Sequence, residues 1–184
     1  MNGFAAATQL LSRAGLNGFF IEYVCLATSV VDAMLRIGLI LRYQTENHTN
    51  EILDELLYQG EEDKTVPERE VYREALEHGI INEELFAQLN NLYSERNRVI
   101  HRYIISDITT GQVLDIGIRY EKVIPVISRE ISKLEAKQME LGVGMTVTGS
   151  EVTKSQLNQM SAKKHRDPNL IRKLGGQKPP LHTR

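Results

Sequence analysis

The chain has 184 residues, 41% hydrophobic and 25% charged, which is typical of a soluble globular protein with one domain and an extension. Its single cysteine, Cys25, excludes an internal disulfide and a cysteine-based metal cluster. The formal net charge of −2 hides an asymmetry: residues 1–141 hold 22 acidic and 14 basic residues, whereas residues 142–184 hold two acidic and eight basic residues. We therefore expect an acidic body and a basic tail with separate roles.

Two helices are predicted at the start of the chain. Residues 4–14 form a short helix that ends at Gly15, and Asn17 can cap a long helix over residues 18–44. The long helix is apolar nearly all round, so we expect it at the centre of the fold.

The polar residues of this long helix share one narrow stripe. Glu22, Asp32 and Arg36 are among them, and Asp32 and Arg36 stand four residues apart, close enough to pair. The stripe is either a polar seam that satisfies itself or part of a functional surface. Charges at these positions would be costly in a lipid bilayer. With no secretory signal recognisable at the N-terminus, we expect a cytoplasmic protein with no membrane partner.

Three further helices each have a start signal in the sequence: residues 50–59 after Thr49, residues 67–78 with Pro67 in the first turn, and residues 82–106 with Asn82 as the cap. A last helical stretch covers residues 113–140, where Pro125 must either kink the helix or mark its true start. The pattern predicts an all-α fold, an up-and-down bundle of four to five helices over residues 1–141.

The C-terminal segment differs in composition from the predicted bundle. Residues 142–150 are rich in glycine and threonine and indicate a linker, and the polar, basic chain from residue 151 onward is predicted to be disordered in isolation. This tail either attracts nucleic acid, docks on the acidic body or on a partner, or is an inert terminus.

The informative motif lies near the end of the predicted helix over residues 82–106. On a helical wheel Arg96, Asn97, His101 and Tyr103 share one continuous arc, and Arg96 points along the apolar stripe of that helix. An unpaired buried charge is costly. Either Arg96 pairs with a carboxylate of the central helix, such as Glu22 or Asp32, or the stripe opens into a cleft or a subunit interface.

The spacing Arg96-Asn97-x-x-x-His101-x-Tyr103 resembles the nuclease signature of the HEPN superfamily, the higher eukaryote and prokaryote nucleotide-binding domains. The resemblance covers roughly residues 18–140. It implies a helical bundle that forms a homodimer with two motifs facing across a cleft, and cleavage of RNA without a metal. Arg96 would then stabilise charge on the phosphate, His101 would transfer protons, and Asn97 would orient the phosphate or His101.

The same resemblance suggests roles for the neighbouring residues. The Arg-x4-His-x-Tyr form is similar to HEPN toxins, in which the matching tyrosine can be modified by a partner nucleotidyltransferase; a cognate antitoxin or such an enzyme is therefore an expected partner. Tyr103 either serves in this way, binds substrate or belongs to the core. Arg98 and Arg102 would contact the RNA backbone at the rim of the cleft, or simply be solvated.

A second hypothesis remains open beside the ribonuclease. An acidic body attracts nucleic acid poorly, so the chain could instead be a non-catalytic helical module that dimerises and binds a nucleotide or a protein partner. No His, Asp or Glu spacing suited to a divalent ion is evident, so neither hypothesis invokes a metal or another cofactor.

Overall fold

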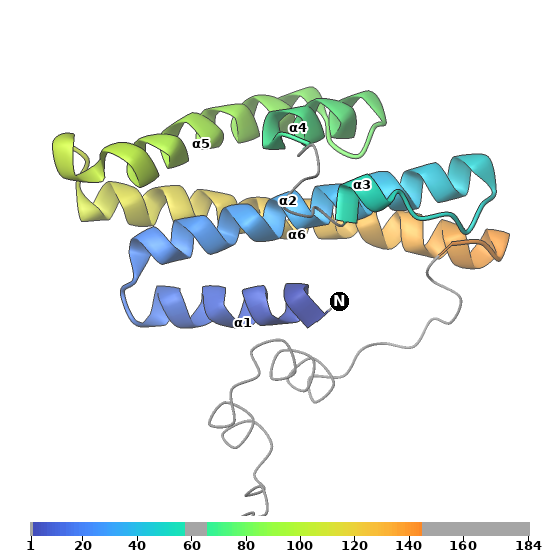
Figure 1. Cartoon of the computed structure of the whole chain (residues 1–184), viewed down its shortest axis with the longest axis horizontal. Helices are drawn as coiled ribbons and strands as arrows, with labels where there is room; N and C mark the ends of the chain where they lie inside the picture. Colours follow the sequence, from blue (N-terminus) through green and yellow to red (C-terminus); the bar gives the residue numbers. More distant parts are fainter. Residues whose placement is uncertain (1, 58–65, 145–184) are drawn as a thin grey trace, which may run out of the picture.

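The computed structural model describes residues 2–57 and 66–144, and the described chain is all-α, as predicted (Figure 1). Its helices are α1 (Asn2–Leu16), α2 (Phe20–Asn47), α3 (Asp54–Leu57), α4 (Glu68–Glu77), α5 (Glu83–Arg102), the 3-10 turn η1 (Tyr103–Ile105) and α6 (Thr110–Leu141).

Two long helices, α2 and α6, form the centre of the bundle and run in the same direction (Figure 1). At one end the hydroxyl of Tyr23 donates to Glu121, and at the other the buried side chain of Gln138 donates to Gln44 over 2.5 Å. A Cβ on Gly117 would clash with the ring of Tyr23. Glycine at this position therefore lets the two helices approach closely.

The other helices cover the central pair from two sides. Figure 1 shows α1 on one side of α2, with α4 and α5 on the opposite side. Directions alternate along the chain except between α2 and α4, which run in parallel: Arg36 donates to the carbonyl of Val66, and Arg42 donates to that of Gly79. The segment between α2 and α4 thus returns along the bundle, a departure from a strict up-and-down order.

The long helix α2 is central, as its apolar composition predicts. It is long and apolar enough to cross a membrane, but 61% of its most apolar window is buried inside the described structure. Val24, Val31, Leu35 and Ile40 are fully buried there. Packing against α1, α4, α5 and α6 therefore occupies the apolar surface of α2.

Helix boundaries follow some of the predicted signals and depart from others. Asn82 caps α5 as predicted, accepting from the backbone N–H of Leu85 over 2.9 Å. Asn17 was predicted to cap the long helix, but its side chain donates to the carbonyl of Arg13 and thus satisfies the end of α1. Pro125 lies inside α6 and neither begins nor ends it.

The predicted helix over residues 50–59 is largely wrong within the described residues, where α3 spans only Asp54–Leu57. The hydroxyl of Thr49 accepts from the N–H of Glu51, which makes a local turn rather than a helix start. The proposed tail falls beyond Gly144, outside the described residues.

Candidate functional site

Arg96 projects from the middle of α5 into the interior between α2, α4 and α5, and only 15% of its side chain is exposed. Its Nη2 donates to Oε2 of Glu68, at the start of α4. The guanidinium carbon also lies 4.8 Å from the centre of the Tyr93 ring, one turn earlier on α5. A carboxylate and an aromatic face thus fix the orientation of the guanidinium.

Arg96 borders an open cavity of about 300 Å³. The cavity is lined by Cys25, Thr28, Ser29, Asp32 and Arg36 of α2, by Glu68 of α4, and by Arg96 and Ile100 of α5. Asp32 and Arg36 form the predicted pair, with Nε donating to the carboxylate over 2.7 Å. Two guanidiniums and two carboxylates therefore share the wall of one cavity.

Several polar atoms of this wall remain without a partner. Asp32 Oδ1, Arg36 Nη1 and Arg96 Nε are buried and make no hydrogen bond within the described residues. Such atoms favour a polar ligand or solvent in the cavity over an apolar one. Burial also raises the pKa of the neighbouring Cys25 thiol, an effect that the charge of Arg96 opposes.

The partner of Arg96 is itself held in place. The buried hydroxyl of Tyr72, one turn along α4, donates to the other carboxylate oxygen of Glu68. Burial raises the pKa of the Glu68 carboxyl above its ordinary value, while the Tyr72 hydrogen bond and the Arg96 charge act in the opposite direction. Arg96, Glu68 and Tyr72 thus form one connected polar cluster, the Arg96 cluster, in the interior of the bundle.

The predicted charge partners of Arg96 on the central helix, Glu22 and Asp32, are wrong. The observed partner is Glu68, although Asp32 lies across the same cavity. Glu22 is exposed and lines a different cavity. No pattern in the sequence singles out Glu68, because a pair between α4 and α5 depends on how the two helices cross.

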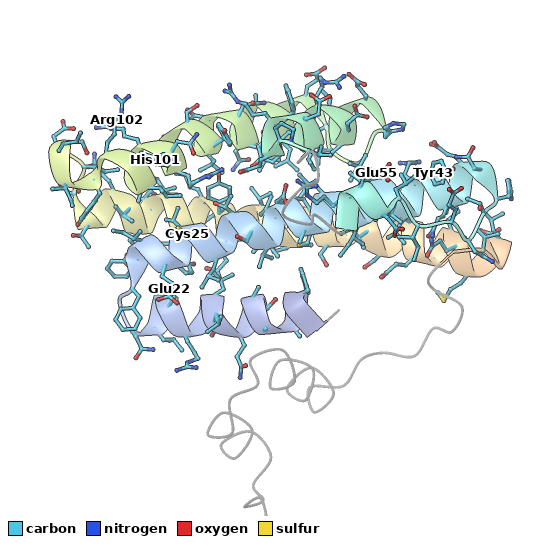
Figure 2. The ribbon with its side chains drawn as sticks, in the orientation of Figure 1. Glu22, Cys25, Tyr43, Glu55, His101 and Arg102 are labelled. Atoms are coloured by element: carbon cyan, nitrogen blue, oxygen red, sulfur yellow. The ribbon has the colours of Figure 1, made fainter. Side chains whose placement is uncertain are left out.

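His101 and Arg102 lie on the last turn of α5, at the end of the bundle where α2 begins (Figure 2). Both side chains are exposed, and His101 is not one of the residues that line the Arg96 cavity. The preceding residue Ile100 does line that cavity, but successive side chains of a helix point about 100° apart, so His101 has a different direction. A substrate would therefore have to extend from the cavity onto the surface to meet both motif residues.

The other motif residues lie in different surroundings. Asn97 is half-buried next to Arg96, and the exposed Arg98 pairs with Asp107 over 2.6 Å. Arg102 is exposed. Of the two predicted backbone contacts, Arg98 thus already has an anionic partner.

Tyr103 lies in η1, beyond the end of α5, so the helical wheel does not describe its direction. The residue is half-buried, and its hydroxyl is 3.1 Å from Oγ1 of Thr110. It borders a second cavity of about 300 Å³, which Phe19 of the α1–α2 connection and Glu22 of α2 also line. Tyr103 and Arg96 therefore face different cavities.

Large apolar side chains are exposed at this end of the bundle. Ile104 and Ile105 of η1 are 95% and 82% exposed, and Leu16 at the end of α1 and Phe19 in the α1–α2 connection are 84% and 59% exposed. An apolar group of this kind typically marks an interaction surface. We call these four residues the end patch.

Comparisons with protein-family models, curated protein sequences and solved structures find no match to this chain. Within residues 2–57 and 66–144, no group of three or more His, Cys, Asp or Glu side chains is placed to hold a metal ion. The geometry of the site and the motif are therefore the basis for a function.

Proposed function

We propose that this chain is a metal-independent endoribonuclease that acts as a homodimer, with a HEPN-like arrangement of Arg96 and His101. The observation that carries the proposal is the Arg96 guanidinium, fixed by Glu68 and Tyr93 at the wall of an open cavity, with His101 exposed one turn further along α5. An oriented guanidinium and an exposed imidazole on the same helix suit cleavage of a phosphodiester that reaches both.

In the proposed reaction, His101 removes the proton from a ribose 2′-hydroxyl. The 2′-oxygen then forms a bond to phosphorus while the bond from phosphorus to the 5′-oxygen breaks. The leaving oxygen takes a proton from the protonated His101 of the second copy, and Arg96 stabilises the negative charge on the phosphate. The products carry a 2′,3′-cyclic phosphate, and DNA, which has no 2′-hydroxyl, is not cleaved.

The end patch supports the dimer in this proposal. Ile104 and Ile105 follow directly after the motif, so a second copy that covers them would bring its own α5 end close to His101. Asn97 would help to orient the phosphate, and Arg102 would bind the backbone at the rim. A ribonuclease of this type would serve as a cytoplasmic toxin or antiviral effector, controlled by a cognate antitoxin or by modification of Tyr103.

The decisive experiment is cleavage of RNA in EDTA, followed by analysis of the new ends. We expect cyclic phosphate ends from the wild type and a loss of about 10²–10⁴-fold in rate for His101→Ala. The exposed His78, on the C-terminal side of α4, offers a matched control, and His78→Ala should keep full activity. Wild-type rates for His101→Ala would disprove the proposal.

A test of Arg96 must separate catalysis from folding, because its guanidinium is paired with Glu68 inside the bundle. Arg96→Ala leaves the Glu68 carboxylate unpaired and tests folding and catalysis together. The double variant Arg96→Met with Glu68→Gln removes both charges at similar volume, so we expect it to fold and to be inactive. Activity in this folded double variant would exclude Arg96 from the reaction.

A second candidate function is a non-catalytic module that dimerises and binds a nucleotide or a protein. It is favoured by the Arg96–Glu68 pair, which gives Arg96 a structural role without any substrate. If this second function is right, the wild type does not cleave RNA, and its interaction with a partner survives His101→Ala. Expression that harms cells only when His101 is present would favour the ribonuclease.

A further inference from the structure

A groove lies at the end of the bundle away from His101, between α2, the segment that includes α3, and α4. Its volume is about 410 Å³, and its apolar lining comes from α2, from the segment that includes α3 and from the residues just before α4: Leu39, Leu53, Leu56 and Val66. We call it the α2–α4 groove. It takes no part in the Arg96 site, although Val66 also receives a hydrogen bond from Arg36 of that site.

The rim of the α2–α4 groove is acidic. Of the described residues that line it, none is Lys or Arg, and four are glutamates: Glu46, Glu55, Glu70 and Glu74. Arg73 pairs with both Glu70 and Glu74 from outside the groove. The charge on the α4 side is therefore partly compensated.

The opposite side of the rim is less compensated. Glu46 has only a long contact of 3.8 Å with Arg42, and Glu55 makes no hydrogen bond or ion pair within the described residues. Figure 2 shows Glu55 near Tyr43, another lining residue. The carboxylates on this side would therefore attract a cationic ligand most strongly.

The end of the described chain lies beside the same groove. The N–H of Gly144 donates to Oδ1 of Asn50 over 2.6 Å, and Asn50 begins the segment that forms one side of the groove. That segment is held to α2 in turn, because Gln44 donates to the carbonyl of Glu51 over 2.7 Å. The chain therefore leaves the bundle next to an acidic, apolar-floored groove.

The 40 residues that follow have the complementary composition, with eight Lys or Arg and two acidic residues. Within them, residues 163–174 read Lys-Lys-His-Arg-Asp-Pro-Asn-Leu-Ile-Arg-Lys-Leu, so five basic residues accompany three large aliphatic ones. Residues 145–162 lie between Gly144 and this segment, and a fully extended chain of that length reaches about 60 Å. The segment can therefore reach the groove from where the chain leaves the bundle.

We propose that residues 163–174 dock in the α2–α4 groove of the same chain. Leu170, Ile171 and Leu174 supply the apolar contacts with the floor, and the lysines and arginines face Glu46 and Glu55. The proposal is independent of the ribonuclease, because it uses neither Arg96 nor His101.

Disulfide trapping in the full chain tests this docking. In a Cys25→Ser background, Asn47→Cys places a thiol in the groove and Asn169→Cys places one in the proposed occupant. The control pairs Asn169→Cys with Ser12→Cys, an exposed position on α1. Docking raises the effective concentration of the first pair, so we expect its single-chain disulfide to form at least about tenfold faster than that of the control.

Charge variants then test what holds the segment. Glu46→Gln with Glu55→Gln should slow trapping severalfold, as should 1 M salt, where the screening length falls to about 3 Å. The matched double variant Glu83→Gln with Glu84→Gln, at exposed positions outside the groove, should not slow it. Equal rates for the groove and control pairs, no effect of the groove charges, or a disulfide found only between two chains would each overturn the proposal.

Discussion

The middle and the end of α5 present the two motif residues in contrasting surroundings. Arg96 is largely buried in a cluster with Glu68 and Tyr72, where contacts from α4 and α5 set its geometry. His101 is exposed one turn later, beside the isoleucines of η1. The difference teaches that one half of the motif is built into the interior of the bundle, while the other half lies on its surface near the end patch.

The largest expected effect is a difference in the free energy of unfolding between Arg96 and His101 variants. Arg96→Ala should lower the free energy of unfolding by about 2–4 kcal/mol, because it leaves a buried carboxylate without its partner. His101→Ala should change it by less than about 0.5 kcal/mol, as is usual for an exposed side chain. Urea unfolding of both variants measures this, and equal losses would contradict the contrast.

Next in size is an effect on association. Ile104→Ser with Ile105→Ser should raise the Kd of the dimer by at least about tenfold, since each buried isoleucine contributes about 1.5–3 kcal/mol. The monomer should keep its stability because both side chains are exposed in it. Sedimentation equilibrium measures the Kd, with Val126→Ser, a 44% exposed position on α6, as control. A wild type that stays monomeric at every concentration would remove the basis of the dimer.

A smaller effect concerns pH and the Arg96 cluster. Without Arg96, the pKa of Glu68 should rise further above its ordinary value, because burial then acts unopposed by that charge. A raised carboxyl pKa means that the folded protein holds the proton more tightly, so stability rises as pH falls through the folded pKa toward the unfolded value of about 4.3. The stability deficit of Arg96→Ala should thus be largest near neutral pH and shrink on acidification. A deficit independent of pH in urea titrations would exclude Glu68 as the stranded charge.

The smallest expected effect is the loss of one hydrogen bond in the cluster. Tyr72→Phe should lower the free energy of unfolding by about 1 kcal/mol, because the Glu68 carboxylate loses a buried donor. Tyr43→Phe removes a comparable but exposed hydrogen bond to Glu51, so its cost should be lower. Thermal unfolding of both variants makes the comparison, and an equal cost would argue against a special role for the buried cluster.

Much of the helical framework was predictable from the sequence because its signals are local. The apolar pattern of α2, the cap at Asn82 and the i,i+4 pair of Asp32 and Arg36 each depend on residues within a few positions of one another. The prediction of a helix over residues 50–59 failed for the same reason. The apolar residues there have helical spacing, but only Asp54–Leu57 form a helix.

The sequence by itself determined the all-α class, the central place of α2 and the presence of a guanidinium on the buried stripe of α5. Only the tertiary structure decided that Glu68 pairs with Arg96, that His101 lies outside the Arg96 cavity, and that α2 runs parallel to α4 and α6. The physical reason is that helix periodicity fixes which face a residue occupies, whereas the partner it meets there depends on the packing of helices distant in the sequence.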